Sequence, residues 1–451
     1  MNAALEALIA RERQAFIAAR PQSATFARAA ARHFAGGVPL HWMRDWPTPS
    51  PLYFQSARDA VVTDVDGHEY VDFCLGDTGA MFGHSPPAVA RAIAAQAPLG
   101  LTTMLPDVRV AAVGEGLAAL FGLPWWQLTQ TATDANRAVL RQARMATGRP
   151  RVLVFDRCYH GTVDETMVIM GEGGATLPRP GQVGRVHDPV ASTVVVEFND
   201  IAAVVIALAR GDIACVLAEP VMTNAGMVLP QPGFLEALRE ACTRRDVLLV
   251  IDETHTLSSG PGGYARARGL AADFIVCGKA IAGGVPCGIY GYSDAVAQRL
   301  LKADARRESG HSGIGTTLAA NPLAIAALAA SLAHLHVPAT YRVMEARAQQ
   351  LASGIEAALQ RHRVKWQVSR VGARLEFGPA PAPRTGRQSV QAIDHELEGA
   401  LHLYLLNRGF VLTPFHNMML ASPVTTAAQV DAFLTVFSTA LDEFAPLMRA
   451  T

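Results

Sequence analysis

Short runs of apolar residues alternate with stretches of helical periodicity through the middle of the chain. The runs VLVF, ACVLA, VLLVI and FIVC occupy 152–155, 214–218, 247–251 and 274–277. Strands that are buried on both faces have unbroken apolar sequences, and strands that alternate with helices usually form parallel sheets. The pattern therefore predicts an α/β fold with a mostly parallel, doubly wound sheet.

The N-terminal part of the chain has three different patterns. Residues 1–35 are rich in Ala and Arg and have helical periodicity. Residues 36–60 contain two glycines and four prolines, which predicts an irregular arm because proline and glycine interrupt helices. Segment 60–75 alternates apolar and polar residues around Asp66-Gly67, which is typical of a β-hairpin.

The C-terminal part predicts a second, smaller domain. Residues 322–362 form an Ala- and Leu-rich helical stretch, and the chain then mixes strand and helix patterns to its end. We therefore expect three segments: an N-terminal helix, arm and small-domain strands at 1–75, a large domain at 76–325, and a C-terminal small domain at 326–451.

Composition narrows the classes of protein. Lys plus Arg and Asp plus Glu both number 39, so the charge does not favour nucleic acid or an anionic membrane as a partner. No apolar run approaches the ~20 residues that a membrane helix needs, and no signal peptide is evident. The six cysteines lack CxxC spacing, so we expect neither a zinc site nor disulfides, and the cytoplasm is the expected location.

Polar residues follow the predicted strands. In an open parallel sheet, ligands bind beyond the carboxyl ends of the strands. The apolar runs lead to Asp156, Glu219, Asp252 and Lys279, and Asp156 is followed by the sequence CYHG at 158–161. We therefore expect the functional groups among these residues.

Lys279 and Asp252 form the most informative pair. Alone, Lys279 is typical of a surface loop and Asp252 of a helix cap. Together they match pyridoxal phosphate (PLP), whose aldehyde needs an amine and whose pyridine nitrogen needs a buried carboxylate. One helix-and-strand interval separates the two residues, so adjacent strands would present them to opposite ends of one ring. Tyr159 is a candidate stacking face.

A phosphate cradle is predicted at the start of a helix, where backbone amides bind anions. Segment 130–137 has Thr131, Thr133 and Asp134 before a helical pattern, although a simple N-cap explains these residues equally well. The glycine and threonines at 315–317 are a second candidate cradle.

The chain resembles the class III, fold-type I PLP-dependent aminotransferases, including the glutamate-1-semialdehyde aminomutases, over nearly its whole length. The motifs that carry the resemblance are DVDGHEYVDF (64–73), FGHSPPAV (82–89), TATDAN (131–136), ATGR (146–149), CYHG (158–161), AEPVMTNAG (218–226), PGFLEALRE (232–240), LLVIDET (248–254), GKAIAGGVPCGIYG (278–291) and GTTLAANPLA (315–324).

The resemblance implies a homodimer and a role toward the cofactor for eight residues. These are Lys279 as the amine that forms the Schiff base and moves the proton, Asp252 at the pyridine nitrogen, Tyr159 on the ring, Ala132 and Thr133 at the phosphate, Thr317 at the phosphate of the neighbouring subunit, and Glu219 and Asn224 as supports.

The chain also departs from the family pattern near the expected cofactor. The family's Ser-Gly-Thr-Glu-Ala is Thr-Ala-Thr-Asp-Ala here, so Ala132 leaves less room for a close backbone approach. The valine usual after Asp-Glu is Thr254, and His255 follows it. His255 is a candidate substrate contact, and a buried histidine satisfied by its neighbours is the alternative.

Other departures affect the expected substrate. An ungapped alignment puts Met43 where the aminomutases have an arginine that binds the substrate carboxylate, with Arg44 one residue away. An acidic residue of the family is also missing from 413–422. Trp46 and Phe415, with Trp42, Met418 and Met419, predict an apolar or aromatic substrate side chain, and core packing is the alternative. Members resembling D-phenylglycine aminotransferase would suit such a pocket.

The predicted function is an aminotransferase that moves an amino group between an amino acid and a 2-oxo acid by a ping-pong mechanism. An intramolecular transfer of the glutamate-1-semialdehyde 2,1-aminomutase type, and a racemase or epimerase, share its first steps. Dependence on a keto acid separates the first two reactions. A non-catalytic regulatory protein is disfavoured because both Lys279 and Asp252 are present.

Overall fold

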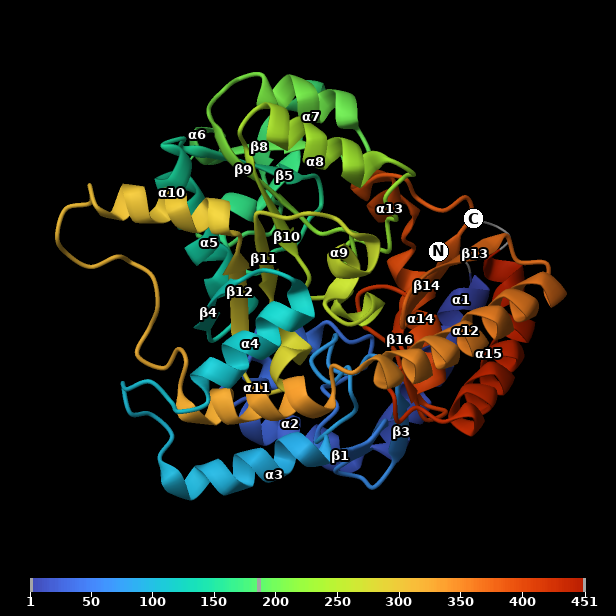
Figure 1. Cartoon of the computed structure of the whole chain (residues 1–451). Coiled ribbons are helices and arrows are strands. Elements are labelled where there is room, and N and C mark those ends of the chain that lie inside the picture. The colour runs from blue at the N-terminus through green and yellow to red at the C-terminus, as the bar shows by residue number, and fades with distance from the viewer. Residues whose placement is uncertain (1–2, 185–187, 449–451) are drawn as a thin grey trace. The chain divides into compact units, whose positions relative to one another are not determined.

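The computed structural model describes residues 3–184 and 188–448. The chain forms two compact units (Figure 1). Unit 1 comprises Met1–Ser85, Arg342–Ala382 and Ala392–Thr451, and unit 2 comprises Pro86–Tyr341 and Pro383–Gln391. The domain boundaries expected after residues 75 and 325 stay a prediction.

Unit 2 is built on a seven-stranded sheet with the order β4-β12-β11-β10-β9-β5-β8. Its strands are β4 (Trp125–Thr129), β5 (Arg151–Phe155), β8 (Thr193–Val196), β9 (Ile213–Ala218), β10 (Leu248–Asp252), β11 (Phe274–Cys277) and β12 (Gly288–Tyr292). Neighbours from β11 to β8 pair in parallel, whereas β12 pairs antiparallel with both β11 and β4. The predicted α/β fold with a mostly parallel sheet is confirmed.

Helices cover this sheet on both faces (Figure 1). The longer helices of unit 2 are α3 (Pro87–Gln96), α4 (Val110–Phe121), α5 (Ala132–Thr147), α7 (Ile201–Leu208), α8 (Phe234–Arg244), α10 (Asp294–Asp304) and α11 (Pro322–His334). The shorter elements are η3 (Ala97–Leu99), η4 (Asp164–Thr166), β6 (Val168–Met170), η5 (Glu172–Gly174), β7 (Thr176–Pro178), α6 (Pro189–Ser192), η6 (Thr256–Ser259), α9 (Gly263–Arg268), η7 (Lys279–Ala282) and α13 (Gly386–Ala392).

Alternate residues of each central strand enter different cores, because side chains alternate across a strand. In β10, Leu248 and Val250 pack in a core with α5 and α10. Leu249 and Ile251 pack instead in a core with α7 and α8. This two-sided burial explains why the predicted strands have unbroken apolar sequences.

Unit 1 combines small sheets with helices. Its elements are α1 (Ala3–Ala19), α2 (Pro21–Ala30), η1 (Ala35–Gly37), η2 (His41–Arg44), β1 (Phe54–Arg58), β2 (Val61–Asp64), β3 (Glu69–Asp72), α12 (Pro338–Arg361), β13 (Trp366–Val371), β14 (Arg374–Pro379), α14 (His395–Leu406), β15 (Phe410–Val411), β16 (Met418–Leu420) and α15 (Ala427–Met448). The strands form sheets β1-β2-β3-β15 and β13-β14-β16. The hairpin expected around Asp66-Gly67 is β2–β3.

The helix expected over 322–362 is two helices, α11 and α12. Pro338 starts α12, and a proline restricts the residue before it and lacks the backbone N–H that a continuous helix would use. Among the described residues, no single helix has the length and apolar composition of a membrane span, and α11 and α12 pass that test only together, as a bent pair.

Candidate active site

The parallel pairing of β10 and β11 brings two chemically different residues to one edge of the sheet. Asp252 ends β10 and pairs in register with Val276 of β11. Lys279 lies three residues beyond Val276, directly after the end of β11. Both residues therefore leave the sheet at its carboxyl edge, from adjacent strands, as the sequence predicted.

Asp252 is buried and surrounded by hydrogen-bond donors. Its Oδ2 accepts from Asn136 Nδ2 and His160 Nδ1, each at 2.9 Å, and its Oδ1 accepts from Thr254 N at 3.0 Å. Burial opposes the charged form, but the bonds from His160, Thr254 and Asn136 outweigh it and lower the pKa of Asp252 to about 2. The carboxylate is therefore charged at neutral pH.

His160 carries the matching positive charge. Burial opposes that charge, but Cys158 and the Asp252 carboxylate outweigh it and raise the pKa of His160 to about 10. His160 and Asn136 lie in the sequence motifs CYHG and TATDAN, which predicted no role for either residue. The available signal was a polar residue, Asn136, on the otherwise apolar face of α5 that holds Ala135, Ala138 and Val139.

Lys279 has an unusual backbone. Its φ is +48°, in the left-handed region that side chains rarely adopt. The half-buried amine contacts the ring of His255, with 2.7 Å between Nζ and Nε2. His255 is only 6% exposed and lies three residues after Asp252. Left-handed residues often occur at functional sites, where the surrounding structure holds the strain.

The start of α5 faces the loop that carries Lys279. Thr131 caps the helix, with its Oγ1 accepting from Asp134 N at 3.2 Å, and Thr133 Oγ1 accepts from Thr162 N at 3.3 Å. A Cβ added to Gly278 would lie 2.8 Å from Ala132 Cβ and 3.0 Å from Ala132 N. Ala132 therefore fits in this position because Gly278 has no side chain.

The loops after β5 and β9 are joined by Glu219. Its Oε1 accepts from Tyr159 N at 3.1 Å, and its Oε2 accepts from Thr223 N at 3.1 Å. Burial raises the pKa of Glu219. Tyr159 is half-buried, whereas Asn224 is exposed in the loop closed by the Met222–Val228 bridge. Glu219 therefore positions the backbone of Tyr159.

Four other predicted residues belong to other segments of the chain. Thr317 is exposed in the irregular segment between α10 and α11. The other three belong to unit 1: Arg44 is exposed, Trp46 packs against a small apolar core, and Phe415 is 41% exposed. Met418 and Met419 of unit 1 are buried. The pocket predicted from these residues stays a prediction.

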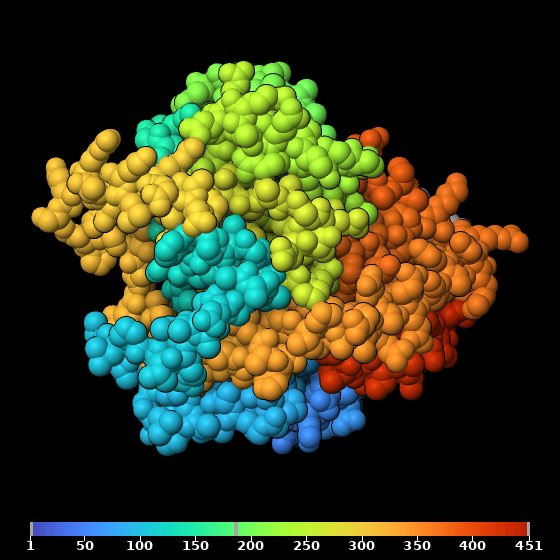
Figure 2. Space-filling view, in the orientation of Figure 1, coloured from blue at the N-terminus to red at the C-terminus, as the bar shows by residue number. Residues whose placement is uncertain are grey.

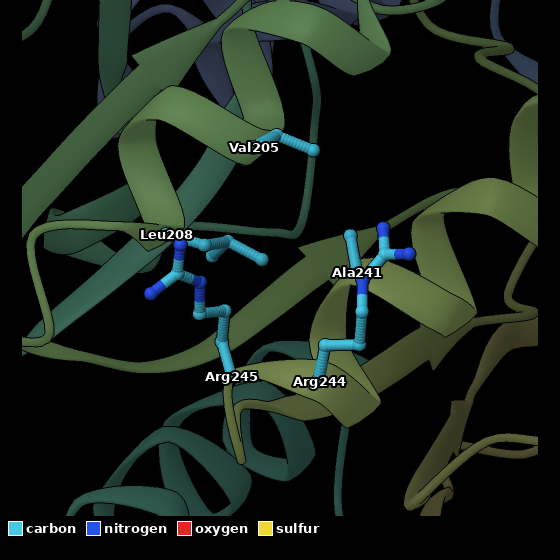
Figure 3. A pocket seen from close by; sticks show the side chains of 5 residues that line it. All are labelled: Val205, Leu208, Ala241, Arg244 and Arg245. Carbon is cyan, nitrogen blue, oxygen red and sulfur yellow. The ribbon is translucent and has the colours of Figure 1, made fainter.

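A surface hollow of about 400 Å³ lies between α7 and α8, lined by Val205, Leu208, Ala241, Arg244 and Arg245 (Figure 3). Its lining residues include the last turns of both helices, which lead into the amino ends of β9 and β10. Chemistry in such sheets is placed at the carboxyl ends of the strands, so this hollow is separate from the candidate site.

The residues at the carboxyl edge fit PLP. A charged carboxylate, an amine and a helix start are the groups that its pyridine nitrogen, aldehyde and phosphate require. Within the described residues, the buried Thr254 Oγ1, His160 Nε2 and Asn136 Oδ1 have no hydrogen-bond partner. Fold and site together define a fold-type I enzyme of the PLP-dependent class.

Comparison with known proteins identifies the family. The family model described as "Aminotransferase class-III" matches residues 43–441. A glutamate-1-semialdehyde 2,1-aminomutase from Desulfosudis oleivorans is 35% identical over 370 residues, which are 81% of this chain and 85% of that protein. The chain therefore belongs to the class III aminotransferase family, whose members depend on PLP.

Solved structures share the whole fold. A glutamate-1-semialdehyde aminomutase from Pseudomonas aeruginosa PAO1 superposes with a TM-score of 0.96 and is 48% identical, covering 98% of this chain and 99% of that one. A variant of that enzyme was solved in complex with PMP. A β-phenylalanine aminotransferase from Variovorax paradoxus has a TM-score of 0.85 at 27% identity, covering 97% of each chain.

These similarities confirm the predicted family, fold and cofactor. They also rank the predicted reactions, because the curated relatives are aminomutases. Intramolecular amino transfer, the alternative in the sequence analysis, is better supported than the intermolecular reaction that was preferred there.

Proposed function

We propose that this chain is a PLP-dependent aminomutase, which moves an amino group between neighbouring carbons of one small substrate. The observation that carries the proposal is the 48% identity to an aminomutase of known structure over 98% of the chain. The charged Asp252 and the amine of Lys279 at one sheet edge support it.

Each residue of the proposed site has a separate role in the reaction. When bound, PLP supplies an aldehyde that condenses with amines and a pyridinium ring that accepts electrons. Asp252 keeps the ring nitrogen protonated, and His160 and Asn136 orient its carboxylate. Lys279 would hold the cofactor through its amine, and its Nζ would move the proton of the substrate. The amides at the start of α5, at Ala132 and Thr133, bind the phosphate.

Lys279 is well suited to this role because the chain has only three lysines. Lys302 and Lys365 are exposed, whereas Lys279 is half-buried and its amine contacts His255. An enclosed amine keeps water away from the bond that it forms. In this proposal, Tyr159 stacks on the ring, and Glu219 and Asn224 support the loops around it.

The proposal includes a homodimer in the cytoplasm, with Thr317 reaching the phosphate of the neighbouring subunit. Large apolar side chains are exposed in unit 2 around residues 99–108, which favours a covered surface. They are Leu99 (76%), Leu101 (47%), Met104 (82%), Leu105 (72%) and Val108 (96%). Residues 301–320 also stand out from the surface of unit 2 (Figure 2). We expect light scattering of the purified protein to give a mass of two chains.

All six cysteines are free and buried.

Intermolecular transamination of an apolar or aromatic amino acid is the second candidate. The Met43 and Arg44 departure favours it, because Arg44 is exposed and packs along Gly36 of the same arm. In this alternative, Trp46 and Phe415 would contact the substrate side chain. The 27% identical β-phenylalanine aminotransferase shows that the fold is shared with an aminotransferase of an aromatic amino acid.

The deciding experiment supplies purified enzyme with glutamate 1-semialdehyde alone, with no second amino or keto compound. Formation of the isomer with the amino group on carbon 1 is the expected result. If the enzyme instead converts an aromatic amino acid only when a 2-oxo acid is added, the aminomutase proposal is wrong and the second candidate holds. Absence of both reactions would contradict both.

A further inference from the structure

His255 has a different environment from the other buried histidines of unit 2. His160 pairs with a carboxylate, and His336 contacts the Ile281 carbonyl at 3.3 Å and the Tyr341 hydroxyl at 3.0 Å. The Nε2 of His255 instead lies 2.7 Å from the amine of Lys279. A buried nitrogen pair at this distance requires one partner to donate a proton to the other.

The backbone holds His255 in this position. Its carbonyl accepts from Ser258 Oγ at 2.9 Å, which closes the turn of η6, and the Glu253 carbonyl accepts from Leu257 N at 2.8 Å. Asp252, three residues earlier, is fixed in β10. The ring is therefore placed by the same strand end that places the Asp252 carboxylate.

We propose that His255 is a positioning residue for Lys279, which accepts a hydrogen bond from the amine whenever Lys279 is not bonded to the cofactor. This inference rests on the proposed role of Lys279. It adds to that role the place where the displaced amine is held, since an amine on a flexible side chain would otherwise leave the reacting carbon.

The contact also has a chemical consequence. Lys279 becomes an ammonium when it takes a proton from the substrate, and a neutral imidazole nitrogen at 2.7 Å stabilises that ammonium because hydrogen bonding to a charged form favours it. His255 therefore favours the step in which the proton moves onto Nζ, and it keeps Nζ in place to deliver the proton again.

Other titratable groups near His255 have hydrogen-bond partners of their own. The Asp252 carboxylate accepts from His160, Asn136 and Thr254. The Glu253 carboxylate accepts from Thr256, Tyr264 and Ala265, and burial raises its pKa to about 7.

Two further groups lie behind the loop of Lys279. The Cys277 thiol, at the end of β11, is directed at the Glu253 and Gly278 carbonyls. Burial lowers the pKa of His336 to about 4, so that ring is neutral at neutral pH.

The test measures Lys279 in full-length protein prepared without cofactor. A limiting amount of acetic anhydride modifies free amines, and mass spectrometry compares Lys279 with the exposed Lys302 and Lys365. In His255→Leu, the amine loses the partner that holds it in place, so we expect acetylation of Lys279 relative to the other two lysines to rise about threefold, as loss of one hydrogen bond predicts. His255→Gln keeps an acceptor and should stay near the wild type.

Turnover of the cofactor-loaded enzyme should change in the opposite direction. We expect kcat to fall about 10-fold or more in His255→Leu with little change in KM, since the misplaced amine acts on the substrate only after the substrate has bound. His255→Gln should recover much of the loss. His255→Asn, whose shorter side chain does not reach Nζ, repeats the test if the leucine variant does not fold.

His336→Leu is the matched control, because it also replaces a buried histidine beside the Lys279 loop. It should lower Tm without changing the acetylation of Lys279. If both leucine variants change acetylation equally, or if His255→Leu changes neither acetylation nor kcat, the inference is wrong. Retained turnover in Lys279→Ala would instead contradict the proposed function, so the two failures are distinguishable.

Discussion

Both units contain buried charged and polar side chains, but burial changes the pKa values of these side chains differently in the two units. The site cluster of unit 2 contains Asn136, His160, Asp252, His255 and Lys279. The second cluster, in unit 1, contains Glu376, Glu398, His402, His416 and Asn417. In the site cluster, Asp252 has three donors and its pKa is lowered to about 2 although it is buried.

In the unit 1 cluster, burial has the larger effect. Burial and the charge of Glu376 raise the pKa of Glu398 to about 8, and burial lowers the pKa of His402 to about 4, although Asn417 lies 2.9 Å from its Nε2. The pKa of His416, which lies 3.1 Å from Glu376, is raised because the charge of Glu376 outweighs its burial, so the charged form of this histidine is favoured. Whether a buried group keeps its charge therefore depends on whether its own partners outweigh the cost of burial.

Removing the amine of the site cluster should have the largest effect. In Lys279→Ala we expect turnover to fall by about 10³-fold or more, since the base that moves the proton is lost. The measurement is kcat at saturating cofactor, with Lys302→Ala as the control that replaces an exposed lysine. If Lys279→Ala keeps its turnover, Lys279 is not the base, and the site cluster would not differ from the unit 1 cluster by a catalytic amine.

Removing the charge of Asp252 is the next test. Asp252→Asn keeps the size of the side chain, and we expect kcat to fall about 10²-fold, the usual effect of deleting one preorganised electrostatic group. The absorbance of bound cofactor should also change, because the ring nitrogen loses its counter-charge. Asp252→Glu retains the charge and should be less impaired; equal loss in both variants would indicate that geometry, not charge, matters.

We expect the unit 1 cluster to affect how the free energy of unfolding depends on pH. Glu398 binds its proton more tightly in the folded chain, with a pKa of about 8 against a usual value of 4.5. Its contribution to stability is therefore full below pH 4.5 and is lost as pH rises through about 8. Glu398→Gln stays neutral, so relative to wild type it should gain on the order of 1–3 kcal/mol between pH 5 and pH 9.

Denaturant unfolding of both proteins across that range makes the measurement. Asp252 has the opposite sign, since its pKa is lowered: its contribution is present above pH 3.8 and is lost as pH falls through about 2. A Glu398→Gln profile parallel to that of the wild type would show that Glu398 is charged in the folded chain.

The close approach of two loops in the site cluster can be tested by a double-mutant cycle. A methyl group added in Gly278→Ala meets Ala132, so we expect a loss of about 1–3 kcal/mol in stability, typical of overpacking. Ala132→Gly in the same chain should restore part of it, because the Ala132 backbone nitrogen remains. Additive effects of the two changes would show that the positions are independent.

The smallest effect is expected outside both clusters. Arg244→Ala removes an exposed ion pair with Glu240, 2.6 Å long, at the hollow between α7 and α8. Such pairs contribute within about 0.5 kcal/mol, so Tm and kcat should stay close to the wild type. A marked loss of turnover would place function at this hollow.

The strands and the central pair of the site were predictable because their signals are local. Each buried strand is a short apolar run, and Asp252 and Lys279 each follow such a run directly. The antiparallel β12 was not predicted. Only 10 residues and no α-helix separate it from β11, and this connection is too short for the crossover that a parallel neighbour needs.

The partners of Asp252 were harder to predict, because their contacts join distant parts of the chain. Asn136 is 116 residues and His160 92 residues from Asp252 in sequence, and no local pattern states which carboxylate a polar residue will meet. Contacts of the unit 1 cluster have the same character, since Glu376 lies in β14 and His416 in the loop before β16. Fold is therefore readable from periodicity, whereas the electrostatics of a site depend on tertiary pairing.

The pairing of Asp252 with Val276 has a consequence for how this chain tolerates insertions. Since the carboxylate and the amine are placed by counting residues from one strand pair, a residue inserted between Val276 and Lys279 would turn the amine away from the carboxylate. A residue inserted beside the exposed Gly269 or Ala271, in the loop before β11, would leave that count unchanged. Insertions and deletions should therefore be tolerated before the amino end of β11 and not after its carboxyl end. This difference between the two ends follows from the backbone pairing of the strand and does not depend on any side chain.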